Sequence, residues 1–444
     1  MKLLSRFSPS FAWCAVRFAV LLFAMFFSPT SYSADVTTDG FKIFVDGKKM
    51  VIKGMNYSPV PIGTVPGKPP YGDYFVPNYR NVWKPDLAMI RAAGINAIKL
   101  YAGNPKENAD GAGTYGNWKQ FLDECYNNGT NPIYVVMFSY VQGGEIAAGG
   151  QAYQRYLEDY EMMVKSTIRH PAVLGYCIGN EIFDGVANNQ KFWTNFGALV
   201  DRADRAGVSM NCKPFLMTAI TDNYTPETSW PAIKEGEKSG KLSKLDAWGV
   251  NVYRGPKIGG EGNSPFAQYK ALMTTLKRSK PFILAEWGTP HSTRPQGTYG
   301  HAGGGVLPIN LDTISESEMG KGKPYFDATT TAKFLTSEWD TIKANIAAKG
   351  NQVCAGGFIF DWCDEYWKGN NPNNHVGGPN QNFLGDAFAG GYGDEAWYGV
   401  TSSVAQSDYG SGKPDIQRTP FKAYDAVKKF YGSSSRLAAE LYEN

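Results

Sequence analysis

Two glutamates each end a short apolar run in the sequence. Glu181 follows Leu-Gly-Tyr-Cys-Ile-Gly-Asn, and Glu286 follows Pro-Phe-Ile-Leu-Ala. Such runs predict buried strands of a parallel sheet, where a solvated surface glutamate would be out of place. A (β/α) barrel positions its reacting groups at the carboxyl ends of its strands. Two carboxyl groups meeting there would supply a proton donor and a nucleophile, the pair required for retaining hydrolysis of a glycosidic bond.

Eight apolar runs bounded by turn residues predict the strands that would position this pair. They cover residues 50–55, 96–101, 132–138, 172–180, 215–220, 245–252, 281–286 and 356–362. Apolar residues at helical spacing lie between several of these runs, and Ser264 followed by Pro265 predicts the start of another helix. Alternation of strand and helix predicts an α/β fold, a single (β/α)8 TIM barrel within residues 34–444.

Three long segments, residues 57–79, 289–325 and 364–398, follow predicted strands. They are rich in glycine, proline or aromatic residues and would emerge at the carboxyl-end face of the barrel. Long loops at such a face more often carry function than serve as plain connections, although disordered insertions are the alternative. We expect these loops to shape the binding site.

Residues 1–33 have the pattern of a secretory signal peptide. Three basic residues precede an apolar run over residues 18–27. Ser31 and Ser33 then supply small residues at the third-last and last positions before the expected cleavage after Ser33. A run of this length falls short of the ~20 residues needed to span a bilayer, although a retained anchor is the alternative. The protein is therefore expected to be secreted or periplasmic, with no membrane span after cleavage.

The charge of the mature chain argues against a nucleic-acid partner. The full chain carries 44 basic and 41 acidic residues, and the expected signal contains three bases and no acid. The mature chain is thus neutral, whereas phosphate recognition requires a basic surface. Aromatic residues form 14% of the chain, which suits stacking on sugars and equally suits a large core. An uncharged ligand is expected.

Neither the cysteines nor the histidines predict a metal or redox site. Five cysteines remain after the signal, an odd number without a Cys-x-x-Cys pair, and buried free thiols on strands are the expectation. The four histidines have no metal-ligand spacing. Asp361, Asp364 and Glu365 form an acidic cluster that is expected to be a solvated loop or to bind hydroxyl groups rather than a metal. No cofactor is expected.

Several segments resemble clan A of the glycoside hydrolases. Residues 169–181, Arg-His-Pro-Ala-Val-Leu-Gly-Tyr-Cys-Ile-Gly-Asn-Glu, are similar to the acid/base segment of family 2. Residues 41–57 resemble the start of the barrel in families 2, 5 and 72, and residues 251–253, Asn-Val-Tyr, match a motif on the sixth strand. The clan consists of (β/α)8 barrels with an acid/base Glu after Asn on strand four and a nucleophilic Glu on strand seven.

The resemblance implies roles for particular residues. It implies Glu181 as acid/base and Glu286 as nucleophile, with Asn180 hydrogen-bonding a sugar hydroxyl near the leaving bond. It also implies that Tyr253 hydrogen-bonds the nucleophile and that Trp362 is the floor of the sugar subsite.

Three more residues are expected at the site. Asn56 and Tyr57 follow the first strand and are expected to face it. Lys99 occupies the place of an arginine that helps to orient the nucleophile in the clan. Lysine keeps the charge of arginine and loses its bidentate geometry.

These features predict an exported, monomeric, retaining β-glycoside hydrolase that acts on a β-linked glucan or related oligosaccharide or polysaccharide. A β-glucan transglycosylase is one alternative, because the same mechanism transfers a sugar when the acceptor is not water. A barrel that binds glycans without cutting them is an alternative of another class.

Overall fold

The computed structural model describes residues 33–66, 74–101, 115–222, 226–260, 262–291, 328–347, 352–368, 371–373, 375 and 394–432. The expected signal peptide lies outside this part of the chain apart from Ser33. Most of the second and third long loops also lies outside it.

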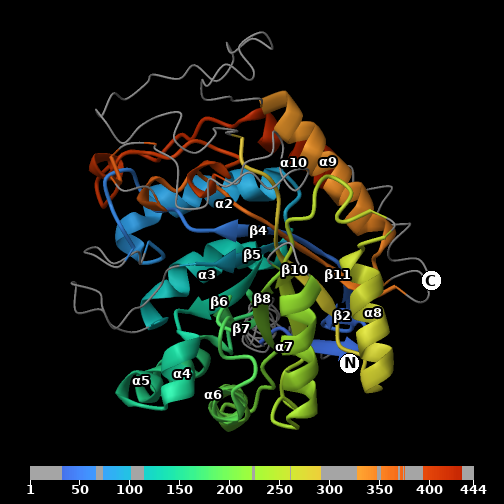
Figure 1. The fold of residues 1–444 in the computed structure, drawn as a ribbon. Coiled ribbons are helices and arrows are strands. Elements are labelled where there is room, and N and C mark those ends of the chain that lie inside the picture. The colour runs from blue at the N-terminus through green and yellow to red at the C-terminus, as the bar shows by residue number, and fades with distance from the viewer. Residues whose placement is uncertain are drawn as a thin grey trace, which may run out of the picture.

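Eight parallel strands close into a barrel (Figure 1). They are β4 (Ile52–Tyr57), β5 (Ala97–Leu100), β6 (Tyr134–Ser139), β7 (Val173–Asn180), β8 (Leu216–Thr221), β9 (Ala247–Asn251), β10 (Phe282–Trp287) and β11 (Cys354–Ile359). Each neighbouring pair is parallel, and β11 pairs with β4 to complete the ring. The predicted TIM barrel is confirmed, and all eight predicted strands are present in the predicted order.

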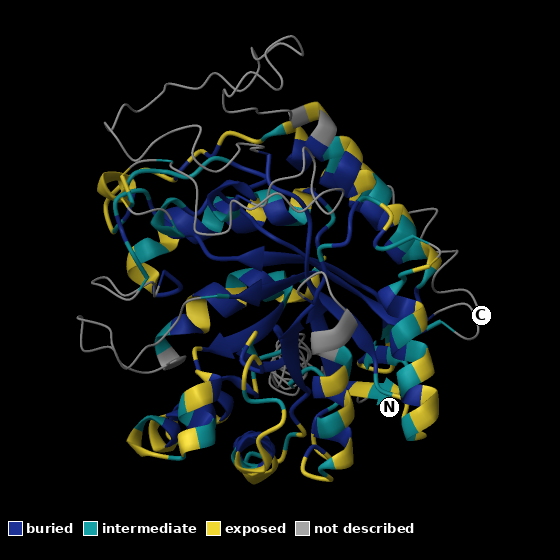
Figure 2. Ribbon diagram, in the orientation of Figure 1, coloured by how far each residue is buried: buried dark blue, intermediate teal, exposed yellow. Residues whose placement is uncertain are grey.

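Helices surround the barrel. The α-helices are α2 (Arg80–Ala92), α3 (Lys119–Tyr126), α4 (Gly143–Ala148), α5 (Gln151–Thr167), α6 (Gln190–Ser209), α7 (Pro226–Lys238), α8 (Pro265–Leu276), α9 (Ala328–Ala344) and α10 (Lys422–Gly432). Short 3-10 helices are η1 (Pro77–Tyr79), η3 (Tyr115–Trp118), η4 (Asn127–Gly129), η6 (Tyr366–Lys368), η9 (Glu395–Trp397) and η10 (Gln406–Asp408). The strands are buried, and the exposed residues gather on the outer faces of the helices (Figure 2). As predicted, Ser264 caps α8, its hydroxyl accepting from the Ala267 amide at 3.4 Å.

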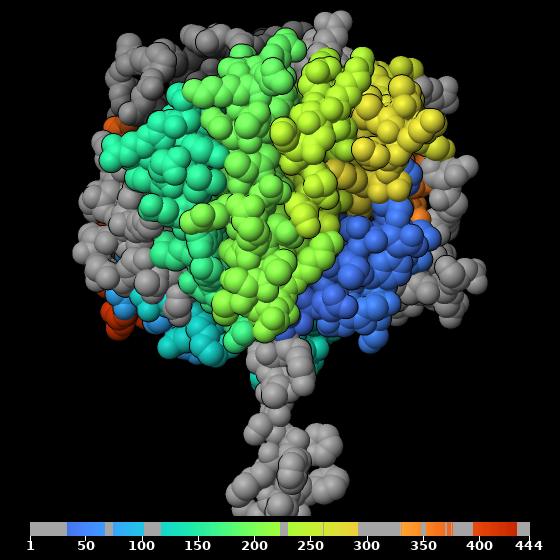
Figure 3. Space-filling model, turned by 90° about the horizontal axis from the view of Figure 1, so that it is seen from below, coloured from blue at the N-terminus to red at the C-terminus, as the bar shows by residue number. Residues whose placement is uncertain are grey.

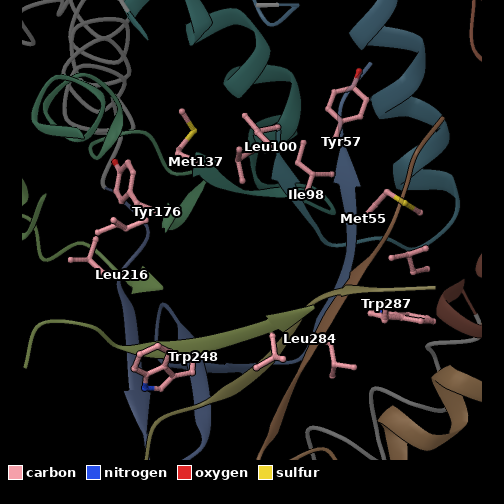
Figure 4. Packing of buried hydrophobic residues seen from close by; sticks show 14 of the residues in the cluster. Met55, Tyr57, Ile98, Leu100, Met137, Tyr176, Leu216, Trp248, Leu284 and Trp287 are labelled. Atoms are coloured by element: carbon pink, nitrogen blue, oxygen red, sulfur yellow. The ribbon is translucent and has the colours of Figure 1, made fainter. Parts of the chain in front are cut away.

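Strand alternation divides the apolar residues into two layers. Outward-facing side chains of the strands, among them Met55, Ile98 and Leu284, pack against the helices (Figure 4). Trp287 belongs to this layer and stacks on Trp339 of α9, with ring centroids 6.4 Å apart. Inward-facing side chains form a second cluster inside the barrel.

A small antiparallel sheet precedes the barrel and was not predicted. It comprises β1 (Val36–Asp39), β2 (Lys42–Val45) and β3 (Lys48–Met50). Its apolar residues Val36, Ile43, Val45 and Met50 join the interior cluster of the barrel. The sheet appears as the blue patch in the view from below (Figure 3). It therefore covers the amino end of the barrel and leaves the carboxyl end as the face where chemistry can occur.

All five described cysteines are free thiols and four are buried, but only Cys177 and Cys354 lie on strands, so the predicted placement on strands holds for these two alone. Within the described part of the chain, none of the helices combines the length and the apolar character needed to span a bilayer.

Candidate active site

The backbone turns sharply where β7 ends, and this turn places Glu181 at the carboxyl-end mouth of the barrel. Gly179 has a φ of 77°, and Glu181 itself adopts a left-handed φ of 56°. The Glu181 amide donates to the carbonyl of Ala219 on β8 at 3.0 Å. A left-handed glutamate is uncommon, and such backbone conformations concentrate at functional sites.

Glu286 is re-aimed by an irregularity in its strand. The pairing of β10 with β9 shifts register between Leu284 and Glu286, and such bulges redirect side chains. Glu286 is buried, and each carboxylate oxygen has a phenol partner: Tyr253 donates to Oε2 at 2.8 Å, and Tyr101 donates to Oε1. The structure thus places Tyr253 where the resemblance implied.

The electrostatic environment of Glu181 favours its protonated form. The residue is exposed at the mouth, but its carboxyl group lies among many protein atoms. Burial, together with the charge of Glu286, raises the pKa of Glu181 to about 7, although a hydrogen bond from Asn251 acts in the opposite direction. Near neutral pH Glu181 can therefore hold a proton and later accept one.

Lys99 and Asn180 lie beside the nucleophile candidate. Lys99 is fully buried, and its Nζ donates to Asn180 Oδ1 at 3.1 Å and to the Tyr101 hydroxyl. Burial lowers the pKa of Lys99, while the charge of Glu286 acts to raise it. Asn180 therefore connects the strand of the proton-donor candidate to the basic group near Glu286.

Asn56 lies inside the barrel beneath Glu286. Its side chain is fully buried, and Nδ2 donates to the carbonyl of Ala285 at 3.1 Å and to two carbonyls of β11. It braces the strand that carries Glu286 from the barrel interior, and its fully buried side chain offers no exposed surface to a substrate.

The prediction for Tyr57 is wrong. Successive side chains of a strand point to opposite faces, so Tyr57 points away from the interior that Asn56 faces. It lies in the outer apolar layer, stacks on Phe121 and donates to Asp86 Oδ2 at 3.0 Å (Figure 4).

The prediction for Trp362 is also wrong. Trp362 is fully buried and packs edge-on against Tyr424 of α10 at 6.2 Å, outside the barrel. The aromatic ring that faces the site is Phe360, whose centroid lies 6.1 Å from that of Tyr101 and 5.2 Å from that of Tyr398. Because β11 ends at Ile359, strand alternation no longer determines which way the following residues point.

The acidic residues after β11 have different partners, although burial and the charge of Glu365 together raise the pKa of Asp361. Asp364 pairs with His291 at 2.9 Å, and Glu365 lies 3.4 Å from Lys368. Asp361 is fully buried and accepts from the Trp362 amide at 2.5 Å. Among the described residues, no group of three or more histidine, cysteine, aspartate or glutamate side chains could hold a metal ion.

Lys368 and Glu395 form an ion pair of 2.9 Å that sequence reasoning missed. The Lys368 ammonium lies 5.0 Å from the ring centroid of Phe360, and the charges of Lys368 and Glu395 act on Glu181 in opposite directions. Tyr101 was missed as well, although its position two residues after Lys99 puts both on the same face of the chain.

Comparisons with known proteins identify the fold. No protein-family model matches the sequence, and no curated protein matches it. Among solved structures, the chain is similar to a family 2 β-galacturonidase from Eisenbergiella tayi, with a TM-score of 0.53 and 16% identity over 90% of this chain and 54% of that one. The chain therefore spans about half the length of that enzyme.

Two further solved structures are similar to the chain. A family 5 mannosidase from Rhizomucor miehei gives a TM-score of 0.53 at 12% identity, covering 93% of this chain and all of that one. Gas2p of Saccharomyces cerevisiae in complex with laminaripentaose gives 0.50 at 14% identity, covering 93% and 73%. The chain shares the (β/α)8 barrel fold of these proteins. At these identities the likeness concerns the fold, and the activity must be argued from the site.

Proposed function

We propose that this protein is an exported retaining β-glycoside hydrolase that cleaves a β-linked glucan or related saccharide by double displacement. The observation that carries the proposal is the pairing of two unlike glutamates at one barrel mouth. Glu181 has a pKa raised to about 7, and Glu286 accepts two phenol hydrogen bonds. Environments that set two carboxyl groups apart in this way assign an acid and a nucleophile.

In the first step, a carboxylate oxygen of Glu286 attacks the anomeric carbon. The glycosidic C–O bond breaks while Glu181 donates its proton to the leaving oxygen. In the second step, ionised Glu181 takes a proton from water, the water oxygen attacks the anomeric carbon, and Glu286 leaves as a carboxylate. Each turnover thus returns both groups to their starting protonation states.

Phe360 supplies an apolar ring at the mouth, and Asn180 supplies a polar group beside both strands of the carboxylate pair. The Lys368–Glu395 ion pair lies next to that ring and offers further hydrogen-bonding groups. An uncharged sugar suits this mixture. Export and a monomeric state rest on the sequence and remain part of the proposal.

A β-glucan transglycosylase is the second candidate. The similarity to Gas2p, whose structure was solved with laminaripentaose, favours including β-1,3-linked substrates and sugar acceptors in any test. The same two glutamates serve either reaction, because only the group that Glu181 deprotonates in the second step differs.

The decisive experiment incubates the purified protein with β-1,2-, β-1,3-, β-1,4- and β-1,6-linked gluco-oligosaccharides and measures product masses. Only shorter products would indicate hydrolysis and identify the linkage, whereas longer products would indicate transfer. Glu286→Ala must abolish activity. Glu181→Gln must impair natural substrates more than aryl glycosides, because a good leaving group needs less protonation. Retention of near-wild-type activity by Glu286→Ala would refute the mechanism, and binding without cleavage by wild type would favour a glycan-binding barrel.

A further inference from the structure

Lys99 is too far from the nucleophile candidate for a direct hydrogen bond. Its Nζ lies 4.0 Å from Glu286 Oε1, whereas charge-assisted hydrogen bonds between these groups are roughly 2.7–2.9 Å long. The hydroxyl of Tyr101 lies within hydrogen-bonding distance of both groups. Tyr101 therefore lies between the buried ammonium and the carboxylate.

The direction of the hydrogen bonds follows from the number of protons. A phenol has one proton, and a lysine ammonium can only donate, so the phenol oxygen accepts from Lys99. Glu286 and Asn180 Oδ1 then compete for the phenol proton. Asn180 Oδ1 already accepts from Lys99 at 3.1 Å and lies 3.4 Å from Asn251 Nδ2, and an ionised carboxylate is the stronger acceptor. The chain of donation thus runs from Lys99 to Tyr101 to Glu286.

The charges agree with this direction. Burial and the charge of Glu286 raise the pKa of Tyr101 well above its usual value, so the phenol keeps its proton. A positive charge on the oxygen side of a phenol polarises its O–H group and strengthens its donation, as in any connected hydrogen-bond chain.

We propose that Lys99 and Tyr101 form one positioning unit that keeps Glu286 ionised and aimed at the substrate, with the phenol conveying the lysine charge to the carboxylate. This inference rests on the proposed role of Glu286 as nucleophile. Tyr253 holds the other carboxylate oxygen at 2.8 Å and is not part of the unit.

The remaining charged groups facing Glu286 come from two other elements. Glu181 lies after β7, and Asp361, Glu365 and Lys368 lie after β11. Because the charge of Lys99 also acts on Glu181 and Asp361, the unit is tested on the Glu286 carboxyl signal itself as well as on the pH profile.

The test compares Tyr101→Phe, Lys99→Met and the double variant. Each single substitution should lower kcat/KM by about 10–100-fold, as expected for loss of a hydrogen bond to a charged group. Because the two residues act in series, the kcat/KM of the double variant should lie within about threefold of that of the less active single variant. The acid limb of the pH profile should move to higher pH in all three. Losses that multiply, or an acid limb that stays in place, would overturn the proposal.

Two further variants separate positioning from folding. Tyr153→Phe removes a phenol that bonds the Asn195 carbonyl at 2.9 Å among the outer helices, and it should leave activity and the acid limb unchanged. Lys99→Arg keeps the charge and should return the acid limb toward its wild-type position. A limb displaced as far in Lys99→Arg as in Lys99→Met would show that the charge is not what matters.

Carbon-13 NMR of protein labelled at the glutamate carboxyl carbons tests the unit without catalysis. The Glu286 signal is assigned by its loss in Glu286→Gln. In Tyr101→Phe and Lys99→Met this carboxyl should titrate at higher pH than in wild type, and an unchanged titration would overturn the unit. If wild type cleaves no β-glycoside, the proposed function fails while this titration still decides whether the unit exists.

Discussion

Removing a buried carboxyl group from α9 should stabilise the protein. Glu338 is fully buried, neither of its carboxyl oxygens has a hydrogen-bond partner among the described residues, and burial raises its pKa well above the usual value. It shares a helix face with Leu335 and Ile342, which pack in the outer apolar layer. An unsatisfied buried polar group costs roughly 1–3 kcal/mol, so Glu338→Leu should raise the free energy of unfolding by about that amount.

The effect should grow with pH. The folded state holds the Glu338 proton more tightly than the unfolded state, in which the pKa is about 4.3. Wild-type stability therefore falls as pH rises from the unfolded pKa toward the folded pKa, and Glu338→Leu and Glu338→Gln both remove this contribution. At about 2.1 cal/mol/K per residue, a chain of this size shifts its Tm by roughly 1 °C per kcal/mol, so Glu338→Leu should gain about 1–4 °C.

Thermal unfolding at pH 5 and pH 8 measures both effects, with the exposed Glu158→Gln as the matched control. The gain of Glu338→Leu over wild type should be larger at pH 8 than at pH 5, and Glu158→Gln should behave as wild type. A wild type that is at least as stable as Glu338→Leu at pH 8, or a gain independent of pH, would contradict the burial argument.

Three further outcomes are expected. Because the proposed acid must be protonated and the pKa of Glu181 is raised to about 7, kcat/KM should fall as pH rises through about 7, and Glu181→Gln should lose this limb; a limb that persists in the variant would assign it elsewhere. Phe360→Ala should raise KM, whereas Trp362→Ala should leave KM near the wild-type value while lowering the free energy of unfolding by about 3–5 kcal/mol, and the reverse pattern in KM would restore the tryptophan as the sugar floor. Arg418→Met breaks a fully buried ion pair with Asp86 of 2.7 Å and should destabilise the fold by about 3–5 kcal/mol, measured by urea unfolding; a loss below about 1 kcal/mol would count against the pair.

The barrel was predictable because each buried parallel strand corresponds to a short apolar run in the sequence. Eight such runs occur in order along the chain. The β1–β3 sheet was missed because its strands are only three or four residues long and alternate with charged residues. Its role depends on four apolar side chains meeting the barrel interior, a contact that no local pattern encodes.

Predictions at the site succeeded where position along a strand determines direction and failed where it does not. Glu286 points into the mouth only because a register shift follows Leu284, and its motif identified it without revealing that cause. Asn56 and Tyr57 are adjacent and therefore point to opposite faces, so both could not face the mouth. Trp362 lies beyond the end of its strand, where the backbone path determines direction, and Phe360 faces the mouth instead.

The two glutamates are connected by hydrogen bonds that run between strands distant in sequence. Lys99 on β5 donates to Asn180, which directly precedes Glu181, and lies 3.5 Å from the carbonyl of Ala285, which directly precedes Glu286. A substitution of Lys99 would thus remove a contact to the residue that precedes each glutamate. Each sequence motif by itself assigns a role to one glutamate. The distance between the two glutamates depends instead on the contacts among β5, β7 and β10. Because the barrel closes these strands into one ring, the buried ammonium of Lys99 can contact the residues that precede both glutamates and so help to fix the two carboxyl groups relative to each other.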